Sequence, residues 1–521
     1  MKKYLLSLVA LVCAMNVFAE DSWVTKKFSP VSSESDLAGI HTTVAADGSV
    51  YSSSTINQQL QFGTSTIAPE GGLLSSCVVK YNAEGEEQWA VLLYGMSTIS
   101  SMITDADGNC YVVGSFMDSS LDLQGTDGNQ ITLAGDASYL YGFVAKITAD
   151  GKFVAAKSIL TNTNSEVAIS EYPMYMGEWD APYLTVEPMK VKVDGSKVYV
   201  SLSYKGDVSV DEKILLNGAY SFVWDYYYVD NNSKGVISFN SSDLSGAQMV
   251  ACVQMTNNKT EADLTPHPEA MDFVVMSGMV GVAFIGWGNL TLSTPTQSKA
   301  FEFKMMGEGL NEHGMVLSML TDIEHMSLVY HAAPQDKEYT QYNLFGEMSG
   351  TNIILGGTFS GQFPLDNSKY SKSAGEENKY NHASFLATIS PMTSSVNYSW
   401  VNEAEDESFT NGMVVTGEET HVGTDAKVYH FKTANLEEKG SESMTILDAA
   451  QFNDQYVALV STDGADVVTM FQEMSPSAVQ EVKAADVSVA KYFGIDGTEI
   501  PAPQKGLSID KTADGVVKIA K

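Results

Sequence analysis

Two segments of this sequence combine aromatic rings with carboxylates, and that combination suits ligand binding. They lie within residues 171–183 and 222–230. Aromatic rings pack on the apolar faces of neutral sugars or anchor protein interfaces, while Asp and Glu accept hydrogen bonds from hydroxyl groups. Long loops also bury aromatic side chains to hold themselves together, so a purely structural role is the competing interpretation. The candidate ligand-binding residues are Tyr172, Tyr175, Trp179, Trp224, Tyr226, Tyr227 and Tyr228.

Motifs for catalysis or for tight metal binding are missing from the sequence. It contains no HExxH, GxSxG or SxxK pattern and no glycine-rich phosphate-binding loop. Its eight histidines are scattered, so they could meet only in space. We therefore expect no catalytic residues, no metal site and no resident cofactor. A hydrolase or lyase acting on polysaccharide at a central channel is the alternative, and carboxylates converging on such a channel, with or without histidine, would favour it.

A run of acidic residues from Asp105 to Asn109 is similar to the start of a calcium-binding loop. An EF-hand would need a glutamate at its twelfth position, where this sequence has Phe116. A tight turn that uses Asp and Gly explains the run better. Weak calcium binding elsewhere remains an expectation from the acidic charge alone.

The elements that must position these residues are short strands, because one strand pattern recurs along the chain. The pattern is clearest in residues 46–51 with 77–85 and in residues 105–114 with 142–151. Gly48 and Gly108 are 60 residues apart, and Gly85 and Gly151 are 66 residues apart. Weaker copies pair residues 194–200 with 235–239, 281–286 with 300–304, 353–359 with 385–389, 412–415 with 428–432, and 455–460 with 467–471.

Seven such pairs, with little helical periodicity, predict an all-β fold, a beta-propeller of seven blades. Four-stranded blades stack around a ring because none can bury both of its faces alone. The last two units are shorter than the others, so a propeller of six or eight blades is the alternative. We assign residues 20–478 to the propeller. Each unit is longer than the usual repeat of about 40 to 50 residues. We expect the functional residues to lie in the additional loop segments, above all in residues 161–190 and 204–234.

The clearest copies carry a family resemblance. The order Asp-Gly-Asn-x-Tyr-Val-Val-Gly-x-Phe in residues 107–116, followed by Gly-Phe-Val-Ala-Lys-Ile-x-x-Asp-Gly in residues 142–151, resembles SBBP-type beta-propeller repeats of secreted bacterial proteins. The close match covers about residues 40–160, and farther on Ser238 or Thr388 replaces the lysine of the second strand. The resemblance implies structural modules without shared catalytic residues.

Both ends of the chain indicate export. Residues 1–19 have the basic start, apolar centre and Val17-Phe18-Ala19 cleavage site of a secretory signal peptide. Residues 479–521 are predicted to form a C-terminal β tail, which is similar to tails of Bacteroidetes secreted proteins related to type IX sorting signals. Leu507-Ser508-Ile509 stands where those tails have Ile-Tyr-Ile, and a plain β appendage is the alternative. We expect a secreted, periplasmic or outer-surface location.

The charge of the chain limits the classes of partner it can bind, and the number of cysteines limits its disulfide bonds. The formal charge is −34, and it becomes −36 once residues 1–19, with two lysines and no acid, are removed. Such a field repels nucleic acid and anionic lipid. All 30 basic residues are lysine, so the bidentate contacts that arginine makes with phosphate or carboxylate are not available. Cys77, Cys110 and Cys252 of the mature chain are predicted to be buried thiols, with a Cys77–Cys110 bridge as the alternative.

The sequence therefore predicts a secreted or surface-associated, non-enzymatic propeller that binds a glycan or a protein through its loops. We expect a monomer without a transmembrane segment and without nucleic acid as a partner. A structural or adhesive component of the cell surface is a further alternative.

Overall fold

The structure of the chain is a computed structural model built from strands and turns. It comprises two compact units, residues 1–474 and residues 475–521. No helix long and apolar enough to cross a membrane occurs in the part of the chain that the structure describes. The described residues are 24–28, 39–69, 74–162, 184–223, 227–256, 268–303, 305–306, 310–311, 313–332, 343–362, 371–372, 382–391, 393, 395–402, 408–452, 456–463, 466–473, 491–493, 499–500, 508–511 and 517–520.

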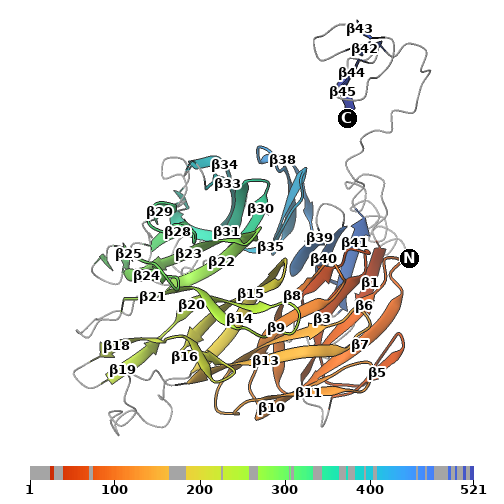
Figure 1. Cartoon of the computed structure of the whole chain (residues 1–521), viewed down its shortest axis with the longest axis vertical. Helices are drawn as coiled ribbons and strands as arrows, with labels where there is room; N and C mark the ends of the chain where they lie inside the picture. The colour runs from red at the N-terminus through yellow and green to blue at the C-terminus, as the bar shows by residue number, and fades with distance from the viewer. Residues whose placement is uncertain are drawn as a thin grey trace, which may run out of the picture. The chain divides into compact units, whose positions relative to one another are not determined.

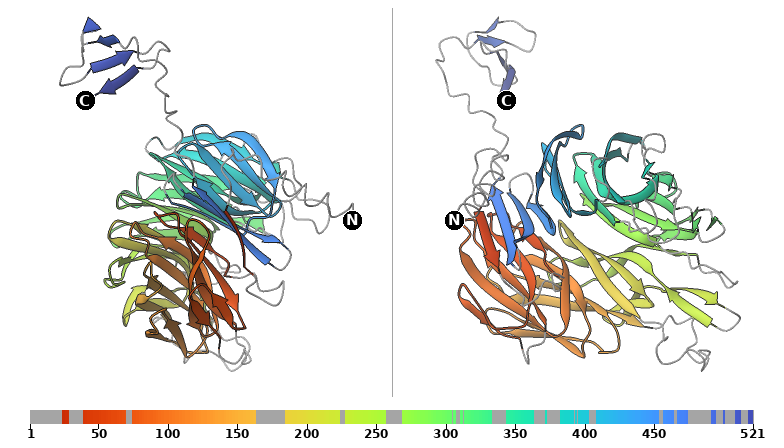
Figure 2. Two further views of the ribbon diagram at one scale, coloured as in Figure 1. Left: turned by 90° about the vertical axis from the view of Figure 1, so that its right-hand side faces the viewer. Right: turned by 180° about the vertical axis from the view of Figure 1, so that it is seen from behind.

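The first unit is a seven-bladed beta-propeller (Figures 1 and 2). Each blade is an antiparallel sheet whose four principal strands, named a to d, run from the central channel to the outer wall. The strands of the first three blades, in the order a to d, are as follows. Blade 1 has β2 (Thr42–Val44), β3 (Val50–Ile56), β6 (Ser75–Tyr81) and β7 (Glu87–Tyr94); blade 2 has β8 (Ser97–Thr104), β9 (Cys110–Phe116), β12 (Tyr141–Ile147) and β13 (Phe153–Asn162); blade 3 has β14 (Thr185–Asp194), β15 (Lys197–Lys205), β20 (Ser233–Asn240) and β21 (Gln248–Met255).

The other four blades follow the same plan, and the N-terminal strand completes the last of them. Blade 4 has β22 (Pro268–Met276), β23 (Met279–Trp287), β28 (His313–Met319) and β29 (Ser327–Ala332); blade 5 has β30 (Asn343–Ser349), β31 (Asn352–Gln362), β33 (His382–Ser390) and β34 (Ser395–Val401). Blade 6 has β35 (Thr410–Val415), β36 (Glu419–Thr424), β37 (Lys427–Lys432) and β38 (Glu437–Ser443); blade 7 has β39 (Asp448–Phe452), β40 (Tyr456–Asp463), β41 (Asp466–Glu473) and β1 (Val24–Phe28).

Strand β1 closes the ring. It pairs antiparallel with β41, from Val24 opposite Phe471 to Phe28 opposite Val467. Figure 1 shows the red β1 beside the blue β41. The innermost strands also contact one another around the channel, including β2 of blade 1 against β39 of blade 7. The prediction of seven blades is confirmed, and the ring closes without a covalent link.

The repeated pattern corresponds to strands b and c of each blade. These strands are covered on both faces by the neighbouring blades, so β3 and β6 are buried at every position. Outer strands alternate instead, as in β13, because one face packs inward and the other meets solvent. The b–c pairs predicted for blades 1, 2, 3, 5 and 7 are confirmed.

Two of the predicted pairs are wrong. Residues 300–304 were expected to pair with residues 281–286, but the c strand of blade 4 is β28, and residues 298–302 form β25 at the outer wall. Residues 412–415 were expected beside residues 428–432, but they belong to β35, the a strand of blade 6, and β36 lies between them. Both errors arise because residues 300–304 and 412–415 contain short apolar runs like those of the b and c strands.

A tyrosine and a lysine of the clear repeats tie blade 1 to blade 2 and blade 2 to blade 3. The Tyr111 hydroxyl and the Lys146 ammonium of blade 2 both donate to the carbonyl of Ser241 in blade 3, at 2.7 and 2.9 Å. Tyr51 and Lys80 do the same from blade 1, donating to Gly108 O and Ala149 O of blade 2 at 2.7 and 3.0 Å. The repeat is therefore clear where this clamp is present, because the clamp fixes both residue types.

Replacing Lys146 with methionine is expected to lower the free energy of unfolding by about 1–2 kcal/mol, since a hydrogen bond from a charged group is lost at a blade junction. Chemical denaturation measures the change. Lys152→Met is the matched control, because the Lys152 side chain lies 43% exposed beside Asp150, and it should leave the denaturation midpoint unchanged. Equal effects of the two substitutions would contradict the role of the clamp.

Hairpins from one blade extend the sheet of the blade before it. β10 (Ser120–Gln124) of blade 2 pairs with β7 of blade 1, and β11 (Gln130–Ala134) follows it as the sixth strand. Blade 3 supplies β16 (Asp207–Val210) and β17 (Lys213–Leu216) to blade 2 in the same way. Blade 4 supplies β24 (Asn289–Ser293) and β25 (Ser298–Glu302) to blade 3. These hairpins cover outer strands that would otherwise expose an unpaired edge.

The long connections all lie at one end of the blades. Strand direction alternates, so the a–b and c–d connections share one face of the propeller, and the b–c and d–a connections share the other. On the first, the short-turn face, the longest connections are residues 241–247 and 320–326. On the second, the insertion face, connections reach the lengths of residues 57–74, 117–140, 163–184, 206–232, 288–312 and 363–381. The two faces therefore differ greatly in the amount of chain that they carry.

The acidic run from Asp105 to Asn109 forms the a–b turn of blade 2. The Asp105 carboxylate accepts hydrogen bonds from the backbone N–H groups of Asp107 and Asn109, at 3.0 and 2.9 Å. Gly108 has a φ of 74°, a conformation that glycine adopts without strain. The side chains that were compared with a calcium loop thus stabilise a turn.

The thiols of Cys77, Cys110 and Cys252 are buried and free, as the first interpretation predicted. Cys77 and Cys110 lie in β6 and β9, the c strand of blade 1 and the b strand of blade 2. Burial raises the pKa of Cys77 to about 12, so this thiol is protonated and unreactive at neutral pH.

The second unit contains a small antiparallel sheet, which confirms a C-terminal β appendage. Its strand order is β43-β42-β44-β45. The bounds of these strands are Lys491–Phe493 for β42, Glu499–Ile500 for β43, Ser508–Lys511 for β44 and Val517–Ala520 for β45.

Candidate functional site

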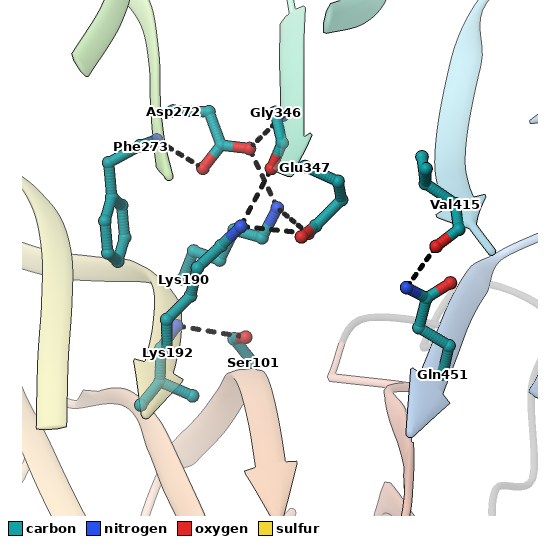
Figure 3. A network of polar contacts seen from close by, with 10 residues as sticks. Ser101, Lys190, Lys192, Asp272, Phe273, Gly346, Glu347, Val415 and Gln451 are labelled. Atoms are coloured by element: carbon teal, nitrogen blue, oxygen red, sulfur yellow. Dashed lines mark hydrogen bonds and ion pairs between the residues drawn. The ribbon is translucent and has the colours of Figure 1, made fainter. Parts of the chain in front are cut away.

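The central channel is a cavity of about 890 Å³ that all seven inner strands line. Its most strongly charged wall comes from blades 3, 4 and 5. There β14 supplies Lys190 and Lys192, β22 supplies Asp272, and β30 supplies Glu347 (Figure 3). Residues two apart in a strand point to the same side, so both lysines face this wall.

The four charges neutralise one another. Lys190 Nζ lies 2.8 Å from Asp272 Oδ2 and 3.3 Å from Glu347 Oε1, and Lys192 Nζ lies 2.9 Å from the same Glu347 oxygen. The backbone N–H groups of Phe273 and Gly346 each donate to Asp272 at 2.7 Å. Lys192 also donates to the Gly346 carbonyl at 2.8 Å. Asp272 is only 2% exposed, so its charge depends on these partners.

The pKa values of the network follow from burial opposed by neighbouring charge. Burial alone would raise the pKa of Glu347, but Lys192 and Lys190 outweigh it and hold that pKa below its usual value. Burial would lower the pKa of Lys190, but Asp272 and Glu347 raise it instead. Burial dominates at Lys192 and lowers its pKa. Glu347 is therefore ionised, whereas a general acid for glycoside cleavage needs a raised pKa.

Polar side chains bridge every junction between neighbouring inner strands. These strands belong to separate sheets, so the backbone groups on their edges need other partners. Around the ring the bridges are Thr104 to Val44 O, Val191 N to Ser101, Lys190 to Asp272, Gly346 N to Asp272, Asn343 to Thr410 O, Gln451 to Val415 O, and Thr42 N to Asp448. Figure 3 shows the Gln451 bridge and the lysine network as separate groups of contacts. The polar residues of the channel thus hold the ring together.

One histidine–carboxylate pair also lines the channel. His41 Nδ1 lies 3.5 Å from Asp448 Oδ2, which accepts the Thr42 N–H as well. This is the kind of pair that would favour a channel enzyme. Within the described residues, however, no hydroxyl or thiol is hydrogen-bonded to the His41 ring. The pair joins blade 1 to blade 7, so ring closure accounts for it.

The aromatic candidates belong to two insertions with a common root. Thr161, at the end of β13, donates from Oγ1 to the carbonyl of Lys205 at the end of β15, at 2.6 Å. Gly206 follows with a φ of 83°, and a Cβ atom there would lie 2.4 Å from Asn162 O. β16 then runs back along β13, and the chain returns through β17 to Gly218, whose N–H donates to Asp207 Oδ1 at 2.7 Å. The connection 163–184 and the hairpin of β18 (Ala219–Val223) and β19 (Tyr227–Asn231) therefore begin close together, at the junction of blades 2 and 3.

The positions of the candidates themselves are as follows. Tyr172, Tyr175, Trp179, Trp224 and Tyr226 lie outside the described residues. Tyr227 and Tyr228 begin β19 (Tyr227–Asn231), where their backbones pair with Val223 and Phe222 of β18 (Ala219–Val223). Both strands lie in the connection 206–232, so these backbones belong to a hairpin of the insertion face.

Sequence reasoning missed the channel residues. Lys190, Asp272 and Glu347 are separated by 82 and 75 residues and belong to no local motif. The one available signal was the alternation of Lys190 and Lys192 in an apolar strand, which places two ammonium groups on one side and calls for buried anions.

Comparisons with known proteins add little beyond this geometry. No protein-family model matches the chain. An uncharacterized WD repeat-containing protein of Acanthamoeba polyphaga mimivirus is 32% identical over 114 residues, which is 20% of this chain and 8% of that protein. The chain thus matches less than a tenth of the length of this relative.

Solved structures with a similar arrangement share little sequence with the chain. The beta-propeller domain of Cps50 (Swd1) from Myceliophteria thermophila is 7% identical, with a TM-score of 0.39 over 86% of this chain and 99% of that one. BamB from Moraxella catarrhalis is 11% identical, with a TM-score of 0.35 over 81% and 98% of the two chains. The assignment of seven blades rests on the strand pairing itself.

Proposed function

We propose that this chain is a secreted or surface-associated, non-enzymatic propeller that binds a neutral glycan through its insertion face. The observation that carries the proposal is that the two aromatic insertions begin close together, one after Asn162 and the other at Gly218, beside the contact of Thr161 with Lys205 and of Gly206 with Asn162. The channel also supports the proposal of a non-enzymatic binding protein, because the charged side chains that line it already pair with one another and bridge the blades.

A glycan is favoured over a protein partner by the residue types. The insertions supply Tyr and Trp for sugar faces and carboxylates for hydroxyl groups. Arginine, which is enriched in the anchors of protein interfaces, does not occur in the sequence. A protein partner is the second form of the proposal and an outcome of the test below.

Trp179→Ala and Trp224→Ala are each expected to weaken glycan binding by about tenfold or more, as loss of an aromatic anchor does. The mature chain is applied to an array of neutral polysaccharides, and the affinity for each bound polysaccharide is then measured in solution. Tyr398→Ala is the matched control: this tyrosine is 46% exposed on the outer strand of blade 5, and its loss should change neither binding nor stability.

Three results would contradict the glycan proposal. The first is no binding to any polysaccharide, the second is binding that neither tryptophan affects, and the third is capture of a protein partner that Trp179→Ala or Trp224→Ala abolishes. Release of reducing sugar by the wild type, lost in His41→Ala, would favour the channel hydrolase instead.

A further inference from the structure

A chain of five titratable side chains crosses one face of blade 6. His421 of β36 and His430 of β37 are directly opposed, and their Nδ1 atoms lie 2.8 Å apart. Beyond them, His421 Nε2 lies 3.8 Å from Glu419 Oε2, and His430 Nε2 lies 3.8 Å from Glu442 Oε1. Glu419 also forms an ion pair with Lys439. Each histidine therefore has the other ring on one side and a carboxylate on the other.

This face of blade 6 packs against blade 7. Val422, Tyr429 and Phe431 share a core with Ile354 and Leu386 of blade 5. His421 and His430 alternate with those residues along β36 and β37, so they lie on the opposite face. Glu442 is opposed to Val428, and Val428 packs with Val457 and Leu459 of blade 7.

The histidine pair is buried and surrounded by few charges. His421 and His430 are 5% and 6% exposed. Val457, Leu459, Val468 and Met470 of blade 7 form an apolar cluster on this face, and Ser461 beside them donates to Thr445 O. Among the described residues, the charged groups in contact with the pair are Glu419 and Glu442, and Lys439 lies beyond Glu419. Burial lowers the pKa of both histidines, and Lys439 lowers both further.

A hydrogen bond between two Nδ1 atoms requires one ring to donate and the other to accept. Only neutral imidazole can accept, so the contact depends on at least one neutral histidine. A first proton taken up from solvent leaves one neutral ring, which can still accept the hydrogen bond. A second proton makes both rings imidazolium, so the hydrogen bond is lost and two positive charges are in contact. Each imidazolium can then reach its own carboxylate, at Glu419 or Glu442, only by turning away from the other ring.

We infer that the His421–His430 pair is an acid-sensitive lock on the seam between blades 6 and 7. At neutral pH the shared hydrogen bond joins β36 to β37 under the apolar face of blade 7. In acid the rings separate, and blades 6 and 7 loosen while blades 1 to 3 keep their structure. The sign follows from linkage: the unfolded chain binds protons on both histidines below about pH 6.5, and the folded chain resists them, so local stability is lost as the pH falls.

Hydrogen exchange at pH 7 and pH 5 tests this inference on the full chain. After correction for intrinsic rates, the amides of β36, β37 and β40 should exchange about tenfold faster at pH 5 relative to those of β9 and β12. His421→Gln should reduce the difference, because glutamine does not titrate and only His430 remains to take up a proton. His325→Gln is the matched control, since His325 is 83% exposed beside Asp322 and should leave the acid response unchanged.

A second variant keeps the test decisive if His421→Gln does not fold. Glu442→Gln removes the carboxylate that would receive the His430 imidazolium, so the loss of protection should begin at a higher pH than in the wild type. Equal exchange at pH 7 and pH 5 in blades 6 and 7 of the wild type would overturn the inference. So would an acid response that spreads evenly over all blades, or one that Glu442→Gln leaves unchanged.

Discussion

Deleting residues 24–28 is expected to open the propeller ring and lower its free energy of unfolding by roughly 3–5 kcal/mol. These residues form β1, whose five positions pair with β41. Each interstrand hydrogen bond contributes about 1 kcal/mol net, and without β1 the edge of β41 is exposed. Chemical denaturation of a chain that begins at residue 29, compared with one that begins at residue 20, measures the loss.

The control for this deletion is a chain that begins at residue 24. It lacks only the segment before β1 and should match the longer chain in stability. Adding a peptide of residues 20–30 should restore the stability of the shortened chain, because β41 would again have a partner. A shortened chain as stable as the longer one would show that β1 is dispensable for closure.

Asp272→Ala is expected to destabilise the propeller by about 3–5 kcal/mol, as removal of one member of a buried ion pair does. The substitution leaves Lys190 with Glu347 alone and removes the acceptor of the Gly346 and Phe273 N–H groups. Asp272→Asn keeps a hydrogen-bond acceptor but not the charge, so it should lower the free energy of unfolding by a smaller amount. The free energy of unfolding in denaturant is the measurement.

The matched control removes an exposed carboxylate from an ion pair of similar length. Glu437 lies 2.7 Å from Lys432 and is 58% exposed, so solvent already screens its charge. Glu437→Ala should therefore leave the denaturation midpoint unchanged. If Asp272→Ala also left the denaturation midpoint unchanged, the network would not contribute to the stability of the channel wall.

The b and c strands could be predicted from the sequence because both of their faces are buried. Val50 to Ile56 and Ser75 to Tyr81 are covered on both sides. Asp47-Gly48 marks the turn before the first strand, and Gly85 marks the turn after the second. The inner and outer strands were harder to predict. β35 and β25 contain short apolar runs like those of a b or c strand, and only tertiary pairing distinguishes them.

The channel network could not be predicted for a different reason. Lys190, Asp272 and Glu347 meet only because blades 3, 4 and 5 place their inner strands side by side. That meeting depends on the closure of the ring, and no local spacing encodes it. The common root of the aromatic insertions is of the same kind, since it depends on Gly206 fitting against Asn162. The identity of the aromatic residues was visible in the sequence, but the nearness of the points where their two insertions begin was not.

The pairing of β1 with β41 also determines how the propeller can be held. β41 is a c strand and ends at the short-turn face, and β1 begins at that same face because the two strands are antiparallel. A tether, tag or support joined at residue 24 or residue 473 therefore attaches to the short-turn face. The opposite side, with its long insertions, is left facing away from the point of attachment.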